Sequence, residues 1–170
     1  VTPWIPVTER DESVAFPNPI VFPDLSEIID ISGQTDAGCA LSREGFLFGW
    51  ASSVSSSPYT GSIAVSDGEI VRIPNLPMLV DFSSGGWQIC AVTGTGEVFN
   101  WGQITHLSPE DDVAREFVPT PVQVDGVQNA VSCDCSMVSV CVLLESNEVY
   151  CWGKNHYGNI DNTTSSPTKI

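Results

Sequence analysis

Six cysteines and two histidines are the side chains of this sequence best suited to bind a metal ion or to act as nucleophiles. Cys133 and Cys135 form a Cys-x-Cys pair, and Cys141 follows a short distance later. A zinc site would need two further ligands at suitable spacing, whereas His106 and His156 lie in no paired motif. The sequence therefore predicts no metal site.

The acidic run Glu110-Asp111-Asp112 could supply general acids or ligands for a cation. Acidic runs are more often solvated surface loops, and two isolated histidines are weak partners for a serine or cysteine nucleophile. No glycine-rich loop follows an expected strand and opens a helix, so the sequence gives no support for nucleotide binding. We expect a protein without catalytic activity and without a cofactor.

The charge is one-sided, with 21 acidic residues against 6 Lys and Arg and a formal net charge of −15. Nucleic acids and anionic membranes both attract basic residues, so neither is an expected partner. Apolar runs are shorter than the stretch of about 18 residues that a membrane-spanning helix needs, so no membrane insertion is expected. A basic protein partner or metal cations stay compatible with this charge.

The elements that position these residues repeat with a period of 51 residues, the spacing of Trp50, Trp101 and Trp152. Three further sets keep the same spacing: Cys39, Cys90 and Cys141; Gly45, Gly96 and Asn147; Ile29, Val80 and Val131. Four positions that share one period without an insertion indicate a structural repeat.

Each repeat has the pattern of a β-hairpin. Segments 90–102 and 141–153 each hold an apolar run, a polar break at Thr95-Gly96 or Ser146-Asn147, and a second run that ends at an aromatic pair. Glycine or asparagine at the break suits a turn with positive φ, and the Gly after Trp101 and after Trp152 should let the chain turn sharply out of the second strand. Further expected strands precede and follow the hairpins: 28–31, 79–82 and 130–133; 70–74, 121–124 and 167–170.

Four short strands per unit predict an all-β protein built of β-propeller blades. We expect a propeller segment over residues 19–170, with repeats at approximately 26–76, 77–127 and 128–170. Residues 1–18 are either a proline-rich lead-in or a truncated preceding repeat that contains Trp4. The ring is expected to be incomplete in this chain, because a propeller needs at least four blades to close.

The sequence resembles the regulator of chromosome condensation (RCC1-like) repeat family, most clearly at residues 148–162. Trp152-Gly153 and the residues around it are similar to the family pattern, although Asn159 and Asp161 stand where the family has Gln and Gly. The middle copy keeps the pattern at 98–102 and then departs from it. The resemblance implies a ring of usually seven blades. We therefore expect either a fragment of a larger propeller or a chain that completes its ring by self-assembly through open propeller edges.

Cys141 and Cys151 flank the Ser146-Asn147 turn on neighbouring expected strands, which is compatible with a disulfide; two buried thiols are the alternative. The resemblance supports the disulfide, because secreted members of the family often carry cysteines at both places. Asn162-Thr163-Thr164 is an N-glycosylation sequon in a polar loop. Together these features favour an extracellular or cell-surface location.

The other four cysteines have no such pairing. Cys39 and Cys90 face Gly49 and a polar residue across the expected hairpin, so we expect core thiols there. Cys133 aligns with apolar positions of the other repeats and is also expected in the core, whereas Cys135 aligns with small residues and its state stays open.

Binding is the expected function, because the loops of propeller blades form a broad platform on a rigid scaffold. Loops at 51–66, 103–119 and 154–166 are the candidates. The candidate binding residues are the larger side chains in these loops and one tryptophan outside the 51-residue period: Tyr59, Trp87, His106, Phe117, His156 and Tyr157. Trp87 could instead fill a gap between blades. We expect a non-catalytic interaction or assembly module of a secreted or cell-surface protein. The alternatives are an intracellular scaffold or nucleotide-exchange-type propeller and, third, a propeller enzyme.

Overall fold

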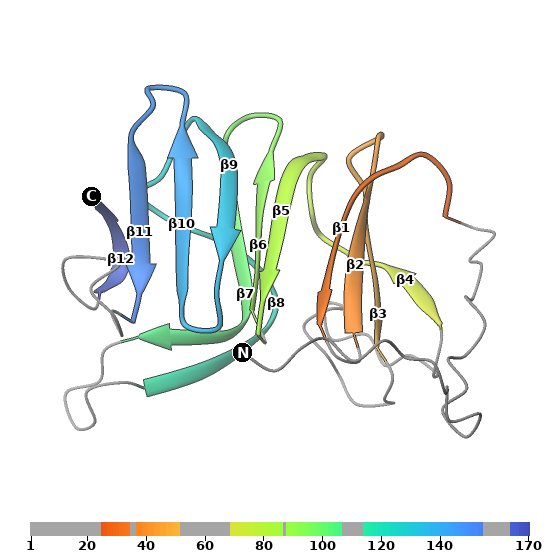
Figure 1. Cartoon of the computed structure of the whole chain (residues 1–170), viewed down its shortest axis with the longest axis horizontal. Helices are drawn as coiled ribbons and strands as arrows, with labels where there is room; N and C mark the ends of the chain where they lie inside the picture. The colour runs from red at the N-terminus through yellow and green to blue at the C-terminus, as the bar shows by residue number, and fades with distance from the viewer. Residues whose placement is uncertain (1–24, 35–36, 52–68, 87, 107–113, 155–163) are drawn as a thin grey trace, which may run out of the picture.

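The computed structural model describes residues 25–34, 37–51, 69–86, 88–106, 114–154 and 164–170. In these residues, strands form three four-stranded antiparallel sheets (Figure 1). The strands are β1 Ile28–Gln34, β2 Ala37–Ser42, β3 Leu47–Ala51, β4 Ile70–Arg72, β5 Leu79–Gly85, β6 Gln88–Thr93, β7 Val98–His106, β8 Ala114–Gln123, β9 Ala130–Cys135, β10 Ser139–Leu144, β11 Val149–Gly153 and β12 Thr164–Lys169. No helix in this part of the chain has the length and apolarity to cross a membrane.

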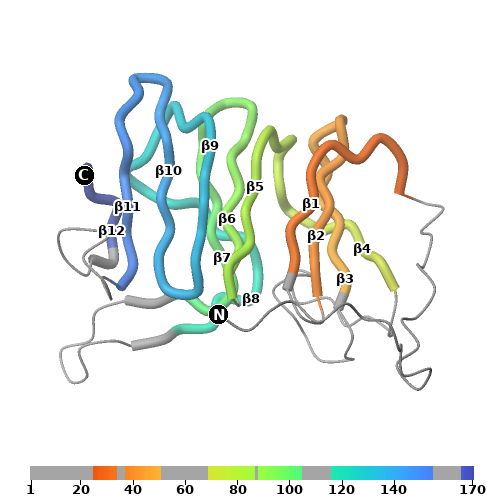
Figure 2. The backbone as a smooth tube through the Cα atoms, viewed as in Figure 1, coloured from red at the N-terminus to blue at the C-terminus, as the bar shows by residue number. Residues whose placement is uncertain are grey.

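The strands of each sheet follow chain order, so we name the sheets blade 1 (β1–β4), blade 2 (β5–β8) and blade 3 (β9–β12). The blades stand side by side in a row, and β5 contacts both β1 and β9 (Figure 2). Blades 1 and 3 lie at opposite ends of this row, so the ring is open (Figure 1). The prediction of three propeller blades in an incomplete ring is confirmed.

Hydrogen bonds between blades repeat with the sequence. The Leu79 N–H donates to the Gly45 carbonyl (2.9 Å) and joins blade 2 to blade 1. The Ala130 N–H donates to the Gly96 carbonyl (3.1 Å) and joins blade 3 to blade 2. Both donor and acceptor advance by one repeat, so the constant period fixes how each blade stacks on the one before it.

The hairpin turns explain why glycine or asparagine recurs at one position. Gly45, Gly96 and Asn147 have φ of 82°, 79° and 64°, in the left-handed region. A Cβ on Gly96 would also lie 2.6 Å from the Asn129 Cα of the next blade. The turn therefore excludes most side chains both by its dihedral angles and by the approach of the neighbouring blade.

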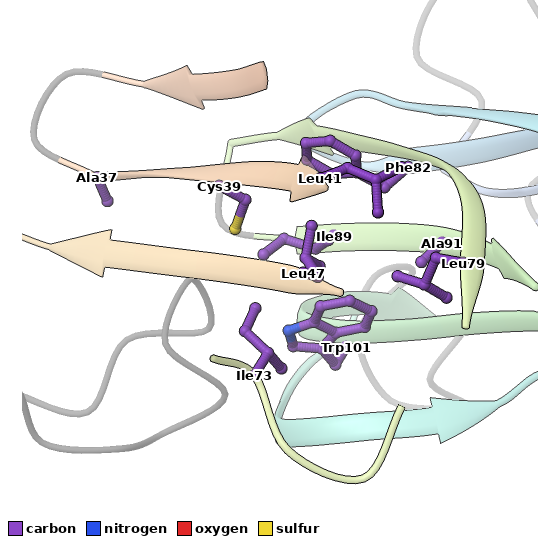
Figure 3. Packing of buried hydrophobic residues seen from close by; sticks show 10 residues of the cluster. All are labelled: Ala37, Cys39, Leu41, Leu47, Ile73, Leu79, Phe82, Ile89, Ala91 and Trp101. Carbon is purple, nitrogen blue, oxygen red and sulfur yellow. The ribbon is translucent and has the colours of Figure 1, made fainter. Parts of the chain in front are cut away.

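Apolar side chains fill the spaces between neighbouring blades. Leu41 and Leu47 of blade 1 pack with Phe82, Ile89 and Trp101 of blade 2 (Figure 3). The equivalent cluster between blades 2 and 3 comprises Cys90, Val92, Val98, Val127, Ala130, Cys133, Cys135, Val140, Val142 and Trp152. Trp101 and Trp152 are buried in these two clusters, so the repeated tryptophan is a structural residue.

The prediction of a loop over 103–119 is wrong in part. β7 runs on to His106, β8 begins at Ala114, and these two residues pair across the ladder. Departure from the repeat indicates a loop, but β-branched and aromatic residues such as Ile104, Phe117 and Val118 flank the gap, and these residue types suit paired strands. The expected loop at 154–166 likewise ends earlier, because β12 begins at Thr164.

Gly102 does not end its strand as predicted. It has a φ of 99° and lies at a register shift that begins at Asn100, and β7 continues beyond it. A bulge uses the dihedral freedom of glycine to bend a strand without ending it. The bend redirects β7 and β8 into a long hairpin extension, residues 102–106 and 114–118, which we call the β7–β8 arm and which runs below blade 3 in the view of Figure 1.

Candidate interaction surface

The predicted binding residues are only partly within the described structure. Phe117 lies on the β7–β8 arm and is 49% exposed. His106 ends β7, opposite Ala114. The remaining candidates lie outside the described residues, and so does the predicted glycosylation site: Tyr59, Trp87, His156, Tyr157 and Asn162.

The structure shows a groove between the outer strands of blade 2 and blade 3, with a volume of about 480 Å³. Its walls come from β7, β8 and the turn after β8 on one side, and from β11 and β12 on the other. The lining residues are Asn100, Ile104, Glu116, Val118, Val122, Gln123, Val124, Asp125, Trp152, Ser166 and Pro167. We call this site the inter-blade groove.

Strand alternation explains which arm residues reach the groove. Glu116 and Val118 lie on one face of β8 and line the groove, whereas Phe117 between them lies on the other face. The predicted residue Phe117 is therefore beside the groove and not in it. Val118, Val122 and Val124 were missed as a site, although alternate valines in this run could have indicated a single apolar face.

The groove combines apolar side chains with negative charge. Val122 is 51% exposed, and the buried Trp152 of blade 3 also lines the groove. Glu116 and Asp125 supply two carboxylates, and none of the lining residues is a Lys, Arg or His. In the described part of the chain the ion pairs lie elsewhere, between Glu27 and Arg43 and between Glu148 and Lys169. This arrangement suits a ligand that is both apolar and cationic.

A second apolar surface lies on the face of blade 1 that points away from blade 2. Ile31 occupies the same repeat position as Phe82 and Cys133. Phe82 and Cys133 pack against the preceding blade and are 3% and 7% exposed, whereas Ile31 is 72% exposed. The face of blade 1 thus presents residues that the other blades use for blade–blade packing.

Cys141 and Cys151 form the predicted disulfide. They are directly opposite in the β10–β11 ladder, and their sulfur atoms are 2.08 Å apart. The residues at the equivalent positions of blade 2 are Cys90 and Asn100, which also face each other. Blade 2 has only one cysteine at this pair of positions, so it cannot form the same disulfide.

The other four cysteines are reduced and buried. Cys39 and Cys90 are core thiols as predicted, and burial raises the pKa of each well above its usual value. Cys133 is in the core as predicted, and Cys135 is buried with it. Hydrogen bonding from the Cys90 thiol lowers the pKa of Cys135, in contrast to the raised pKa of Cys39 and Cys90.

The architecture and the repeated blade contacts define a segment of a β-propeller. Residues 139–159, from β10 to just beyond β11, match the model of the regulator of chromosome condensation (RCC1) repeat. One stretch of the chain thus matches a single RCC1 repeat, in line with the resemblance that the sequence shows. A comparison with curated proteins finds no match.

Solved structures with the same fold include human WBSCR16, with a TM-score of 0.64, 21% identity and coverage of 84% of this chain and 39% of that chain. Yeast RCC1 (Prp20) in its structure with bound Kap60 gives a TM-score of 0.62 at 17% identity, over 86% of this chain and 37% of that chain. Prp20p from Saccharomyces cerevisiae gives a TM-score of 0.63 at 18% identity, over 86% of this chain and 39% of that chain. This chain spans about two fifths of the length of these proteins.

Proposed function

We propose that this chain is a non-catalytic protein-interaction segment of a secreted or cell-surface protein, and that it binds an extended basic segment of its partner in the inter-blade groove. The observation that carries the proposal is the composition of the groove, which sets Val118, Val122 and Trp152 beside the carboxylates of Glu116 and Asp125. A Lys or Arg side chain would lay its apolar stem on the valines and direct its charged end to a carboxylate.

Two further observations support a basic protein partner. The formal net charge of −15 attracts cationic segments and speeds their association with the surface. Among proteins of the same fold, the structure of Prp20p was described together with its binding to Gsp1p and histones, and yeast RCC1 was solved with Kap60 bound. These proteins bind other proteins.

The proposal is tested by fluorescence polarisation with a labelled ten-residue peptide in which Lys alternates with Val. The variant Glu116→Gln/Asp125→Asn should weaken binding by roughly tenfold, because removing charge partners in a recessed site costs on the order of 1–2 kcal/mol. The matched control Glu44→Gln/Glu145→Gln removes two exposed carboxylates from other blades. Equal loss in both variants, or no binding by the unmodified chain, would contradict the groove as the binding site.

The location is a separate part of the proposal. The Cys141–Cys151 disulfide and the Asn162 sequon support an oxidising, extracellular environment. The alternative is an intracellular scaffold or exchange-type propeller, and the four reduced cysteines favour it. Protein isolated from its natural source with rapid thiol alkylation distinguishes them. A glycan on Asn162 with the disulfide intact supports secretion, and a fully reduced chain without glycan supports the alternative.

The exposed face of blade 1 supports a second proposal, in which a second copy of the chain packs its blade 3 against Ile31. The same repeat position already packs on a preceding blade twice within the chain, at Phe82 and Cys133. Sedimentation of the full chain should then show concentration-dependent association that Ile31→Lys weakens. A monomer at all concentrations would contradict self-assembly and leave the groove proposal untouched.

A further inference from the structure

Three thiols meet between blades 2 and 3. Cys90 lies on β6, Cys133 and Cys135 lie on β9, and all three belong to one buried cluster. We call these residues the thiol cluster.

Backbone contacts fix where the Cys135 sulfur lies. Its thiol is within hydrogen-bond distance of the Ser83 carbonyl (3.2 Å) and of the Gln88 carbonyl (3.6 Å). Ser83 is the residue that pairs with Cys90 across the β5–β6 ladder, and Gln88 precedes Cys90 on the same strand face. The Cys135 sulfur is therefore held directly against the strand pair that carries Cys90.

The sulfur atoms of Cys90 and Cys135 differ in chemistry. Burial raises the pKa of the Cys90 thiol, and its hydrogen bonds to the other two sulfurs raise it further. The hydrogen bond from Cys90 lowers the pKa of Cys135, and one from Ser83 adds to this effect. Cys135 is also 8% exposed at the end of β9, whereas Cys90 is fully buried. Cys135 is thus both the more acidic thiol and the one closer to solvent, which are the properties of the first thiol to be oxidised.

We propose that Cys90 and Cys135 are a redox-active pair that hydrogen peroxide converts into a disulfide linking blade 2 to blade 3. The Cys135 thiolate attacks one peroxide oxygen, the O–O bond breaks, and the departing hydroxide takes up a proton to leave as water. Cys135 then carries a sulfenic acid. The Cys90 sulfur attacks the Cys135 sulfur, the S–O bond breaks, and the hydroxide leaves as a second water with the Cys90 proton. Two thiols are oxidised, and one peroxide is reduced to two waters.

The repeat supplies an internal comparison. Cys39 of blade 1 is the counterpart of Cys90. In blade 2, however, Phe82 and Ser84 occupy the repeat positions that Cys133 and Cys135 occupy in blade 3. The interface of blades 1 and 2 thus has one thiol and cannot form the bridge. In the described part of the chain, no group of three or more ligand residues is arranged to hold a metal ion.

Peptide mapping of the full chain tests the proposal. The reduced cluster is prepared with the Cys141–Cys151 disulfide intact, treated with hydrogen peroxide, alkylated and digested without reductant by a protease that cleaves before Asp. This digestion places Cys90 in peptide 81–110, Cys133 in 125–133 and Cys135 in 134–160. The expected product joins 81–110 to 134–160 and is two hydrogens lighter than the sum of the separate peptides.

Other products overturn the proposal. A link between 81–110 and 125–133 would assign the bridge to Cys133, and separate peptides after peroxide treatment would show that no bridge forms. Cys39→Ser, the matched control, should leave the link unchanged, whereas Cys135→Ser should abolish it. The link should also raise the Tm of the oxidised chain, and reductant should reverse this rise. The inference does not depend on the groove, because mapping reports the bond whether or not a peptide binds.

Discussion

Gly85 lies where the backbones of blades 2 and 3 approach each other closely, and its replacement by alanine tests whether this approach holds the blades together. A Cβ on Gly85 would collide with the Cys135 carbonyl oxygen and lie 2.6 Å from the carbonyl carbons of Cys135 and Ser136. All three obstacles are backbone atoms and cannot rotate away. The backbone of Gly85 is not in the left-handed region, so the effect of Gly85→Ala is steric.

The expected magnitude follows from three terms. Overpacking of a well-packed interface costs about 1–3 kcal/mol. Separation of the blades also weakens the hydrogen bond from Gln88 Nε2 to the Ser136 carbonyl (2.7 Å), worth about 1 kcal/mol. Replacing glycine restricts the unfolded chain and returns about 0.4–1 kcal/mol. We therefore expect Gly85→Ala to lower the free energy of unfolding by about 2 kcal/mol, the balance of these terms.

Urea unfolding followed by tryptophan fluorescence measures this change, because Trp101 is buried between blades. Gly94→Ala is the matched control: it also lies outside the left-handed region, and its Cβ would meet only Val80 Cγ1 at 3.7 Å. We expect this control to be unchanged or more stable by up to about 1 kcal/mol. If both variants unfold at the same urea concentration, the close approach of the two backbones does not stabilise the interface.

Three further predictions concern single contacts. Asp81→Ala removes the acceptor of the Cys133 N–H (2.8 Å) and should cost about 1–3 kcal/mol in the same assay. Asp30→Ala, one repeat earlier, removes only an exposed contact to Ile31 and should cost less. Cys141→Ser/Cys151→Ser opens a short loop and should cost about 2–3 kcal/mol under oxidising conditions and nothing measurable in reductant. Hydrogen bonds from Lys169 and Ser146 lower the pKa of Glu148, so its stabilising effect is present above the unfolded-state pKa and is lost as pH falls through the folded-state pKa. Lys169→Met should raise that pKa in an NMR titration, and an unchanged value would refute the contact.

The sequence predicted the features that every repeat shares. Trp50, Trp101 and Trp152 keep one spacing because each occupies the same place in its hairpin, so a period alone was enough to locate the strands. The β7–β8 arm was not predicted because it occurs in only one of the three repeats. Loss of the repeat pattern is the only signal there, and both a loop and an extra strand pair would produce it. The sequence alone does not indicate whether Cys135 is buried, because its counterparts Gly33 and Ser84 give no polarity signal. The contact that buries it comes from Ser83 and Gln88 of the preceding blade, which no pattern within one repeat can show.

The inter-blade groove takes its walls from two blades, so its width depends on the spacing between them. Val118 and Asp125 come from blade 2, and Trp152 and Pro167 come from blade 3. Gly85→Ala changes no groove residue but separates the same two blades. We therefore expect it to weaken peptide binding several-fold in the polarisation assay without denaturant, while Gly94→Ala leaves the Kd unchanged. Unchanged binding by a folded Gly85→Ala variant would show that the groove does not sense blade spacing. A higher Kd would show that contacts between β5 and β9 set the geometry of a binding site formed by the outer strands of the two blades.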